Sequence, residues 1–149
     1  MSYLYTPQCI VCEGEHDRIV LAELAARVLR MNSISRRLDI VVANGQVVIP
    51  RVVQAVEPQF PPDSVIVVAD SDGRPDSTRR MLEKSLGGLD HWLVIAHPNV
   101  ESWITGRIGR LRPEDLRSGA TQADLRSIEA RHPEFKVFRE ALISIPLPR

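Results

Sequence analysis

Residues 64–73 have the sequence Ser-Val-Ile-Val-Val-Ala-Asp-Ser-Asp-Gly, an apolar run that ends in two acidic residues. A short run of this kind, rich in β-branched residues, predicts a buried strand at 64–69. Three similar runs occur at 8–12, 38–43 and 91–96. Continuous rather than alternating apolar runs are typical of a sheet covered on both faces, so the four strands are expected to form a parallel sheet.

Helix-like segments separate the four predicted strands. Apolar side chains recur at helical spacing over 16–31, a segment at 50–56 has proline in its first turn, and Asp76 or Ser77 caps a third segment that runs to Leu86. Strands that alternate with helices imply right-handed crossovers. The expected fold class is α/β, with a parallel four-stranded sheet flanked by helices.

The pattern changes after residue 97, where no further strand is expected. We predict a helical extension packed on the sheet, in one domain that spans 1–149 with a core at about 7–106 and a tail at about 107–149. Its predicted elements are a short helix at 99–105, a turn at 113–117, a capped helix at 121–132 and an amphipathic helix at 133–143.

Composition limits the functional classes. The chain has 19 Lys and Arg against 19 Asp and Glu, which gives a formal net charge of zero. This balance excludes a strongly basic nucleic-acid binder and an acidic-tail protein as descriptions of the whole chain. No apolar run approaches the ~20 residues of a transmembrane helix, and the N-terminus has no signal-peptide pattern, so we expect a cytoplasmic protein without membrane contact.

The two cysteines form one C-x-x-C pair, Cys9 and Cys12, inside the first predicted strand. A structural zinc site needs a second pair of Cys or His ligands at similar spacing. Residues three apart in a strand also point to opposite faces. We therefore interpret both cysteines as buried thiols rather than metal ligands.

Acidic residues follow three of the four predicted strands. Glu13 and Asp17 follow the first, Asp70 and Asp72 follow the third, and Glu101 lies shortly after the fourth. The carboxyl ends of parallel strands share one edge of the sheet, so these five carboxylates are expected to converge there. Like charges at such a place repel one another, and a hard divalent cation removes the conflict through oxygen ligands. The sequence predicts a magnesium-type metal site at this edge.

Two of these acidic motifs resemble the motifs of Toprim domains. The first predicted strand and the residues Glu13, Gly14 and Asp17 match a hydrophobic strand followed by E-G-x-x-D. The third strand, with Asp70 and Asp72, matches the D-x-D motif of the same family. The two motifs together are fairly specific, and the resemblance covers about the first hundred residues in the family's order and spacing.

Two further segments extend the resemblance. Asn44 and Gly45, after the second strand, match a turn-forming motif of Toprim domains. Residues 98–104, Pro-Asn-Val-Glu-Ser-Trp-Ile, are similar to the P-x-x-E-x-W element of Toprim proteins linked to OLD-type nucleases and anti-phage systems. The chain is thus most similar to the small and OLD-type Toprim nucleases.

The resemblance implies a Toprim (Rossmann-like) fold that binds one or two Mg²⁺ or Mn²⁺ ions for phosphoryl transfer on nucleic acid. Catalysis is then assigned to Glu13, Asp70 and Asp72. Metal binding is assigned to all five acidic residues: Glu13, Asp17, Asp70, Asp72 and Glu101.

Phosphate contacts are expected at Gly14, Asn44 and Gly45, where the backbone can pass close to the substrate. OLD-type nucleases use a lysine near the metals, whereas the two lysines of this chain lie outside the motifs. Arg74, Arg107 or Arg110 is the expected replacement, with Arg74 and Arg107 assigned to phosphate binding, because arginine binds phosphate with two hydrogen bonds.

The chain is too short for a topoisomerase or a primase. We expect a Mg²⁺- or Mn²⁺-dependent endonuclease that prefers DNA to RNA. An ABC-type ATPase normally accompanies the OLD-type module, so a separate ATPase subunit is an expected partner, and a homodimer is compatible with the sequence. Two alternatives stay open: an RNA-processing Toprim endoribonuclease, and a non-catalytic metal-binding Toprim module for regulation or assembly.

Overall fold

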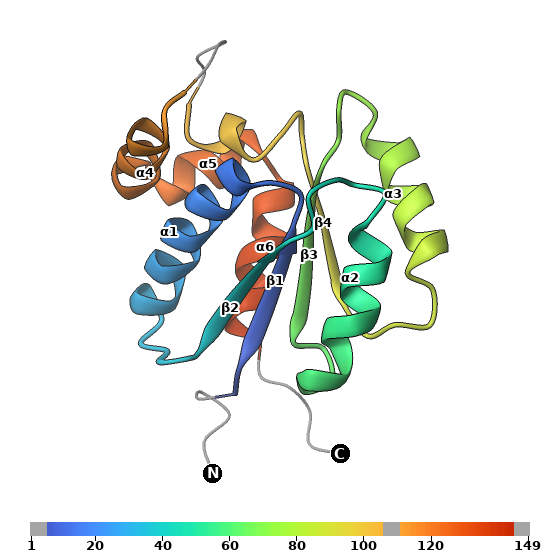
Figure 1. Cartoon of the computed structure of the whole chain (residues 1–149). Helices are drawn as coiled ribbons and strands as arrows, with labels where there is room; N and C mark the ends of the chain where they lie inside the picture. Colours follow the sequence, from blue (N-terminus) through green and yellow to red (C-terminus); the bar gives the residue numbers. More distant parts are fainter. Residues whose placement is uncertain (1–5, 106–110, 145–149) are drawn as a thin grey trace.

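A parallel sheet with helices on both of its faces forms the protein (Figure 1). The computed structural model describes residues 6–105 and 111–144. The elements in chain order are β1 (Gln8–Cys12), α1 (Glu15–Met31), β2 (Leu38–Val42), α2 (Ile49–Val56), η2 (Glu57–Gln59), β3 (Val65–Asp70), α3 (Pro75–Ser85), β4 (Trp92–Ala96), η3 (Glu101–Trp103), α4 (Pro113–Gln122), α5 (Leu125–Arg131) and α6 (Glu134–Ile143).

The sheet has the strand order β2-β1-β3-β4, and all of its pairs are parallel. Ile10 in β1 is opposite Ile40 in β2 on one side and Ile66 in β3 on the other. Every residue of β1 is buried, whereas all five residues of the edge strand β2 are half-buried. The predicted α/β class and the four parallel strands are confirmed, with boundaries within one residue of those expected.

Two apolar layers cover the sheet, one on each face. One layer packs α1, α4, α5 and α6 against the strands, and the other packs α2 and α3 against the opposite face. Cys12 belongs to the first layer and Cys9 to the second, so the two thiols do point to opposite faces. Burial raises the pKa of both thiols to about 12, which fits inert core residues.

The helices after residue 111 share one apolar layer with α1, and α6 packs onto the sheet as expected. In Figure 1, α6 lies beside α1, and it contacts β4, while α4 packs on α1. Phe135 and Phe138 of α6 surround the buried ring of Trp103, with centroids 5.2 and 5.7 Å from it. No helix within residues 6–105 and 111–144 is long and apolar enough to span a bilayer.

Three expectations for the helices are wrong in detail. The turn predicted at 113–117 is the first half of α4, and the single helix predicted at 121–132 is two helices. The chain breaks at Asp124, whose side chain accepts hydrogen bonds from the N–H groups of Arg126 and Ser127 at 2.9 and 3.4 Å and so begins α5. Helix α3 begins at Pro75 rather than at a side-chain cap.

Candidate metal centre

The predicted acidic edge coincides with the switch point of the sheet. The chain connects β1 to β2 over one face and returns from β2 to β3 over the other, so the crevice between the carboxyl ends of β1 and β3 is where such sheets bind ligands. Glu13 directly follows β1, and Asp70 is the last residue of β3. The Glu13 carboxylate accepts a hydrogen bond from the backbone N–H of Asp70, which ties the two strand ends together.

Asp17 is buried beside this pair. It lies in the first turn of α1, its residue is 5% exposed, and its carboxylate accepts a hydrogen bond from the Gly14 N–H at 3.2 Å. Burial raises the pKa of Asp17 to about 7, and the negative charges of Glu101 and Glu13 add to the rise. The ionised form of the Asp17 carboxyl group is therefore poorly solvated.

Asp70 and Glu13 are perturbed in the same direction. Burial raises the pKa of Asp70 to about 8, with further increases from the charges of Asp17 and Glu13, against a 3.0 Å hydrogen bond from the Val100 N–H. Burial also raises the pKa of Glu13, although its hydrogen bond from Asp70 opposes the rise. The structure thus brings together three carboxyl groups that destabilise one another's ionised forms.

The other two predicted carboxylates lie at the rim. Asp72 is exposed in the left-handed conformation, at φ 51°, and its charge raises the pKa of Glu13 and of Asp17. Glu101 begins η3, and its Oε1 lies 3.7 Å from Nδ1 of His16. All five acidic residues therefore face the same edge, with Glu13, Asp17 and Asp70 at its centre.

The chemistry of this cluster fits a hard divalent cation. Its donors are carboxylate oxygens, which Mg²⁺ and Mn²⁺ prefer, and a cation there would remove the repulsion that raises the pKa values. As they stand, the His, Cys, Asp and Glu side chains in the described ranges form no group of three or more that could hold an ion. Mg²⁺ does not require such a cage, since it is commonly held by one or two carboxylates with water and substrate phosphate.

Gln46, which the sequence analysis does not single out, also contacts the acidic residues. Gln46 donates from Nε2 to the Asp70 carbonyl oxygen at 2.9 Å, and its side chain also hydrogen-bonds to the Glu13 carboxylate. Gln46 therefore connects the end of β2 to the ends of both β1 and β3. Its position two residues after Asn44 was the only sequence signal that could have identified it.

The predicted phosphate-binding loop after β2 is tied down by its own backbone. The N–H groups of Asn44 and Gly45 both donate to the Glu13 carbonyl oxygen, at 2.9 and 3.2 Å. A phosphate contact by this loop would therefore use the exposed Asn44 side chain rather than these N–H groups. Gly14 has φ −144° in extended backbone, and its predicted phosphate contact, like those of the loop, stays a prediction.

Gly45 is the position where this loop requires glycine. Its φ is +135°, a conformation that side chains rarely adopt. We expect Gly45→Ala to destabilise the protein by about 1 kcal/mol, measured by thermal or urea unfolding. Asn44→Gly is the matched control, because Asn44 has φ 62° and glycine accepts that conformation without strain. Equal stability of Gly45→Ala and the unmodified protein would contradict the assigned loop conformation.

A polar pocket adjoins Asp72 at the start of α3. Its volume is about 430 Å³. Arg74, one of the predicted phosphate-binding arginines, lies in its wall, whereas Arg107 and Arg110 lie outside the described residues. The residues that line the pocket are Gln46, Ser71, Asp72, Arg74, Ser77, Thr78 and Met81.

The C-terminal helices hold the Glu101 segment in place through one carboxylate. Oε2 of Glu134, at the start of α6, accepts hydrogen bonds from the His97 backbone N–H at 2.8 Å and from the Trp103 indole at 3.0 Å. Nδ1 of His97 in turn lies 2.7 Å from Oγ of the buried Ser71, between Asp70 and Asp72. Glu134 thus fixes both ends of the segment that carries Glu101.

Removal of the Glu134 carboxylate is expected to loosen this segment. Glu134→Ala leaves two donors without their acceptor, so we expect a loss of about 2 kcal/mol in the free energy of unfolding. Glu140→Ala on the same helix is the control, because Glu140 is paired only loosely, 3.9 Å from Lys136, and a surface pair of this kind contributes little. Equal effects of the two substitutions in urea unfolding would show that Glu134 has no special structural role.

Comparison of the chain with protein-family models and with curated proteins found no match. The case for a function therefore rests on the residues of the acidic edge and on what surrounds them.

Proposed function

We propose that this chain is a divalent-metal-dependent nuclease of the Toprim type that cleaves phosphodiester bonds in DNA. The observation that carries the proposal is the placement of Glu13, Asp17 and Asp70 at the switch point of the sheet, where burial raises the pKa of each carboxyl group and the charges of neighbouring acidic residues add to the rise. A protein gains no stability from such an arrangement without a cation, so the cluster is better explained by function.

Glu13, Asp17 and Asp70 would hold one or two Mg²⁺ or Mn²⁺ ions, with Asp72 and Glu101 in support. An ion bound there supplies charge that polarises the scissile phosphate and stabilises the leaving oxygen. Arg74 in the neighbouring pocket can clamp a phosphate with two hydrogen bonds. Glu13, held by the Asp70 N–H, can accept a proton from the attacking water once its carboxyl group is ionised.

The net charge bears on how nucleic acid would be bound. A formal charge of zero gives little of the long-range attraction that dominates DNA binding. A partner subunit, such as an ABC-type ATPase, would supply the missing affinity and orient the DNA over the acidic edge.

One observation favours a second function, a non-catalytic metal-binding module. In the part of the chain that the structure describes, no three metal-ligating side chains are arranged to hold an ion. If a partner or a substrate must complete the metal site, the chain would not cleave nucleic acid on its own. It would then serve in regulation or in assembly with other proteins.

The test is cleavage of supercoiled plasmid DNA and of a structured RNA in Mg²⁺, Mn²⁺ or EDTA. We expect plasmid cleavage that requires metal and that falls at least about 100-fold in Glu13→Gln. Glu140→Gln, an exposed residue of α6, should cleave like the unmodified protein. Cleavage that survives Glu13→Gln would refute the site assignment, and cleavage of RNA alone would favour the endoribonuclease.

A second readout separates the two proposed functions. Metal that binds the folded state raises its melting temperature by mass action, whether or not the protein cleaves. A Mn²⁺-dependent rise in the unmodified protein that is lost in Glu13→Gln, without cleavage of either substrate, would favour the non-catalytic module. Without cleavage and without a thermal shift, both proposals fail.

A further inference from the structure

Within residues 6–105 and 111–144, the edge strand β2 has a strand neighbour on one side only, so one row of its backbone groups bonds to no other strand. Its neighbour in the sheet is β1, and the Arg37 carbonyl and the Ala43 N–H, which flank β2, bond to Gln8 and Cys12. In a parallel ladder alternate residues bond to the same neighbour, so 37, 39, 41 and 43 face β1. The backbone groups of the even-numbered residues, 38, 40 and 42, consequently point outward from the sheet.

Strand β2 has few of the features that protect sheet edges from pairing. Its sequence, Leu-Asp-Ile-Val-Val, contains no proline and no lysine. Its single charge, on Asp39, is 3.5 Å from the Arg37 guanidinium. Apolar edges of this kind pair readily with another strand.

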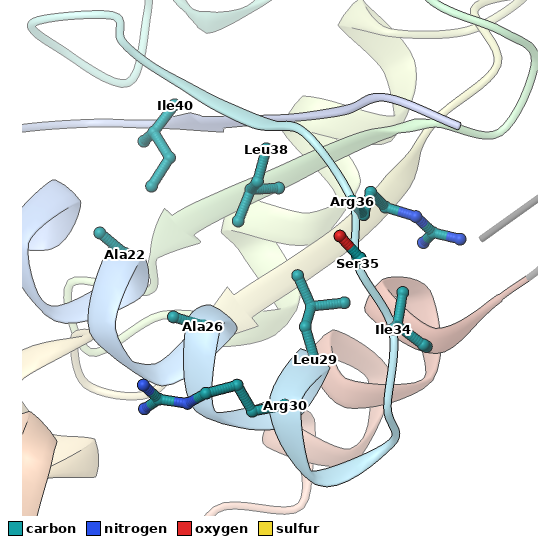
Figure 2. A pocket seen from close by; sticks show the side chains of 9 residues that line it. All are labelled: Ala22, Ala26, Leu29, Arg30, Ile34, Ser35, Arg36, Leu38 and Ile40. Carbon is teal, nitrogen blue, oxygen red and sulfur yellow. The ribbon is translucent and has the colours of Figure 1, made fainter. Parts of the chain in front are cut away.

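A groove runs along this edge on the α1 face (Figure 2). Its volume is about 420 Å³. Figure 2 shows Ala22 and Ala26 of α1 on one wall and Leu38 and Ile40 of β2 on the other, with the Arg30 side chain at the end of the helix. Ala26 is exposed, and a helix surface made of alanine allows close approach of another helix.

We propose that β2 pairs antiparallel with β2 of a second copy of this chain, which forms a homodimer with one continuous eight-stranded sheet. In the paired register Ile40 lies opposite Ile40 of the second copy, and Leu38 lies opposite Val42. All of the outward backbone groups then find partners, and the side chains that meet on the α1 face are apolar.

The hydrogen-bonding pattern and the charges select this register. A shift by two residues, the smallest that keeps the outward-facing residues paired, places Asp39 opposite Asp39 of the second copy in one direction, which is unfavourable. A shift in the other direction leaves Leu38 opposite residue 44, beyond the end of β2. The register centred on Ile40 satisfies both constraints, so the strand is complementary to itself and the second copy is the occupant that fits.

The twofold axis of such a pair is perpendicular to the sheet, so both α1 helices lie on the same face of it and run antiparallel. The surfaces of the two α1 helices that face each other contain Ala22 and Ala26. The groove between α1 and β2 of one copy is then covered by the same groove of the second copy. Stable interfaces bury more than about 1,000 Å², so the walls of the groove contribute to the interface along with the strand.

Cross-linking of the full-length protein tests both the dimer and the register. In a hydrogen-bonded antiparallel pair the Cα atoms lie about 5.5 Å apart, which suits a disulfide. We expect Ile40→Cys to form an intermolecular disulfide on mild oxidation. Leu38→Cys is the matched control, since its counterpart in the second copy lies four residues away along the strand. The native cysteines do not interfere, because both are 0% exposed.

Sedimentation supplies the independent measurement. We expect the unmodified protein to be a dimer at about 100 μM and Ala26→Glu to weaken the dimer at least about tenfold, since the substitution places a charge in the alanine surface that the dimer buries. Ala130→Glu, on the exposed side of α5, should leave it unchanged. A monomer at this concentration, a dimer insensitive to Ala26→Glu, or equal cross-linking of both cysteine variants would overturn the proposal.

Discussion

Asp70→Asn is expected to abolish metal-dependent cleavage and, without metal, to make the protein more stable. The substitution keeps an oxygen that can accept the Val100 N–H, now 3.0 Å from Oδ1, but it removes a charge that Asp17 and Glu13 repel. We expect at least about a 100-fold loss of cleavage. The melting temperature in EDTA at pH 8 should rise by several degrees, since about 1 kcal/mol corresponds to roughly 3 °C for a domain of this size.

The matched control for this substitution is Asp90→Asn. Asp90 is exposed and precedes β4, at the opposite edge of the sheet from the acidic residues. It should change neither cleavage nor stability. Loss of stability in Asp70→Asn would mean that the carboxylate contributes to folding rather than to function.

The second large effect is a dependence of stability on pH. Unfolded aspartates titrate near pH 4, whereas burial raises the pKa of Asp17 to about 7 and of Asp70 to about 8. Between these limits the folded state binds more protons than the unfolded state, so its stability falls as the pH rises. In EDTA we expect the protein to be more stable at pH 5 than at pH 8 by on the order of 3 kcal/mol.

Metal should reverse this trend. Carboxylates bind cations only when ionised, so Mn²⁺ is expected to stabilise the protein strongly at pH 8 and little at pH 5. Thermal unfolding across this pH range, with Mn²⁺ and with EDTA, measures both effects. Asp70→Asn should flatten both curves. A melting temperature that is constant from pH 5 to pH 8 in EDTA would contradict the buried carboxyl cluster.

The strands and the acidic edge were predictable because their signals are local. Each strand is a continuous apolar run, and a parallel sheet places the residues after each run at one edge, which is how Glu13 and Asp70 could be paired across 57 positions. The mutual proximity of the carboxylates followed from topology alone. Topology alone does not say which of the carboxylates are buried, because their burial depends on how η3 and α1 cover the edge.

Gln46 and Glu134 were missed because their roles exist only in three dimensions. Glu134 bonds to residues 31 and 37 positions away, and nothing near it in the sequence marks it as different from other helix-starting glutamates. The break at Asp124 had a local signal, since aspartate is a preferred helix cap. Helical periodicity continues across 121–132, however, and it points to one helix where the structure has two.

The Glu134 carboxylate has a consequence for the order in which the protein is made. All five acidic residues of the edge are synthesised before residue 102, yet the acceptor that holds the Glu101 segment is added more than thirty residues later. A nascent chain that stops short of α6 would carry the full set of carboxylates on an unfinished edge. The Glu101 segment would therefore reach its final position only after α6 has left the ribosome.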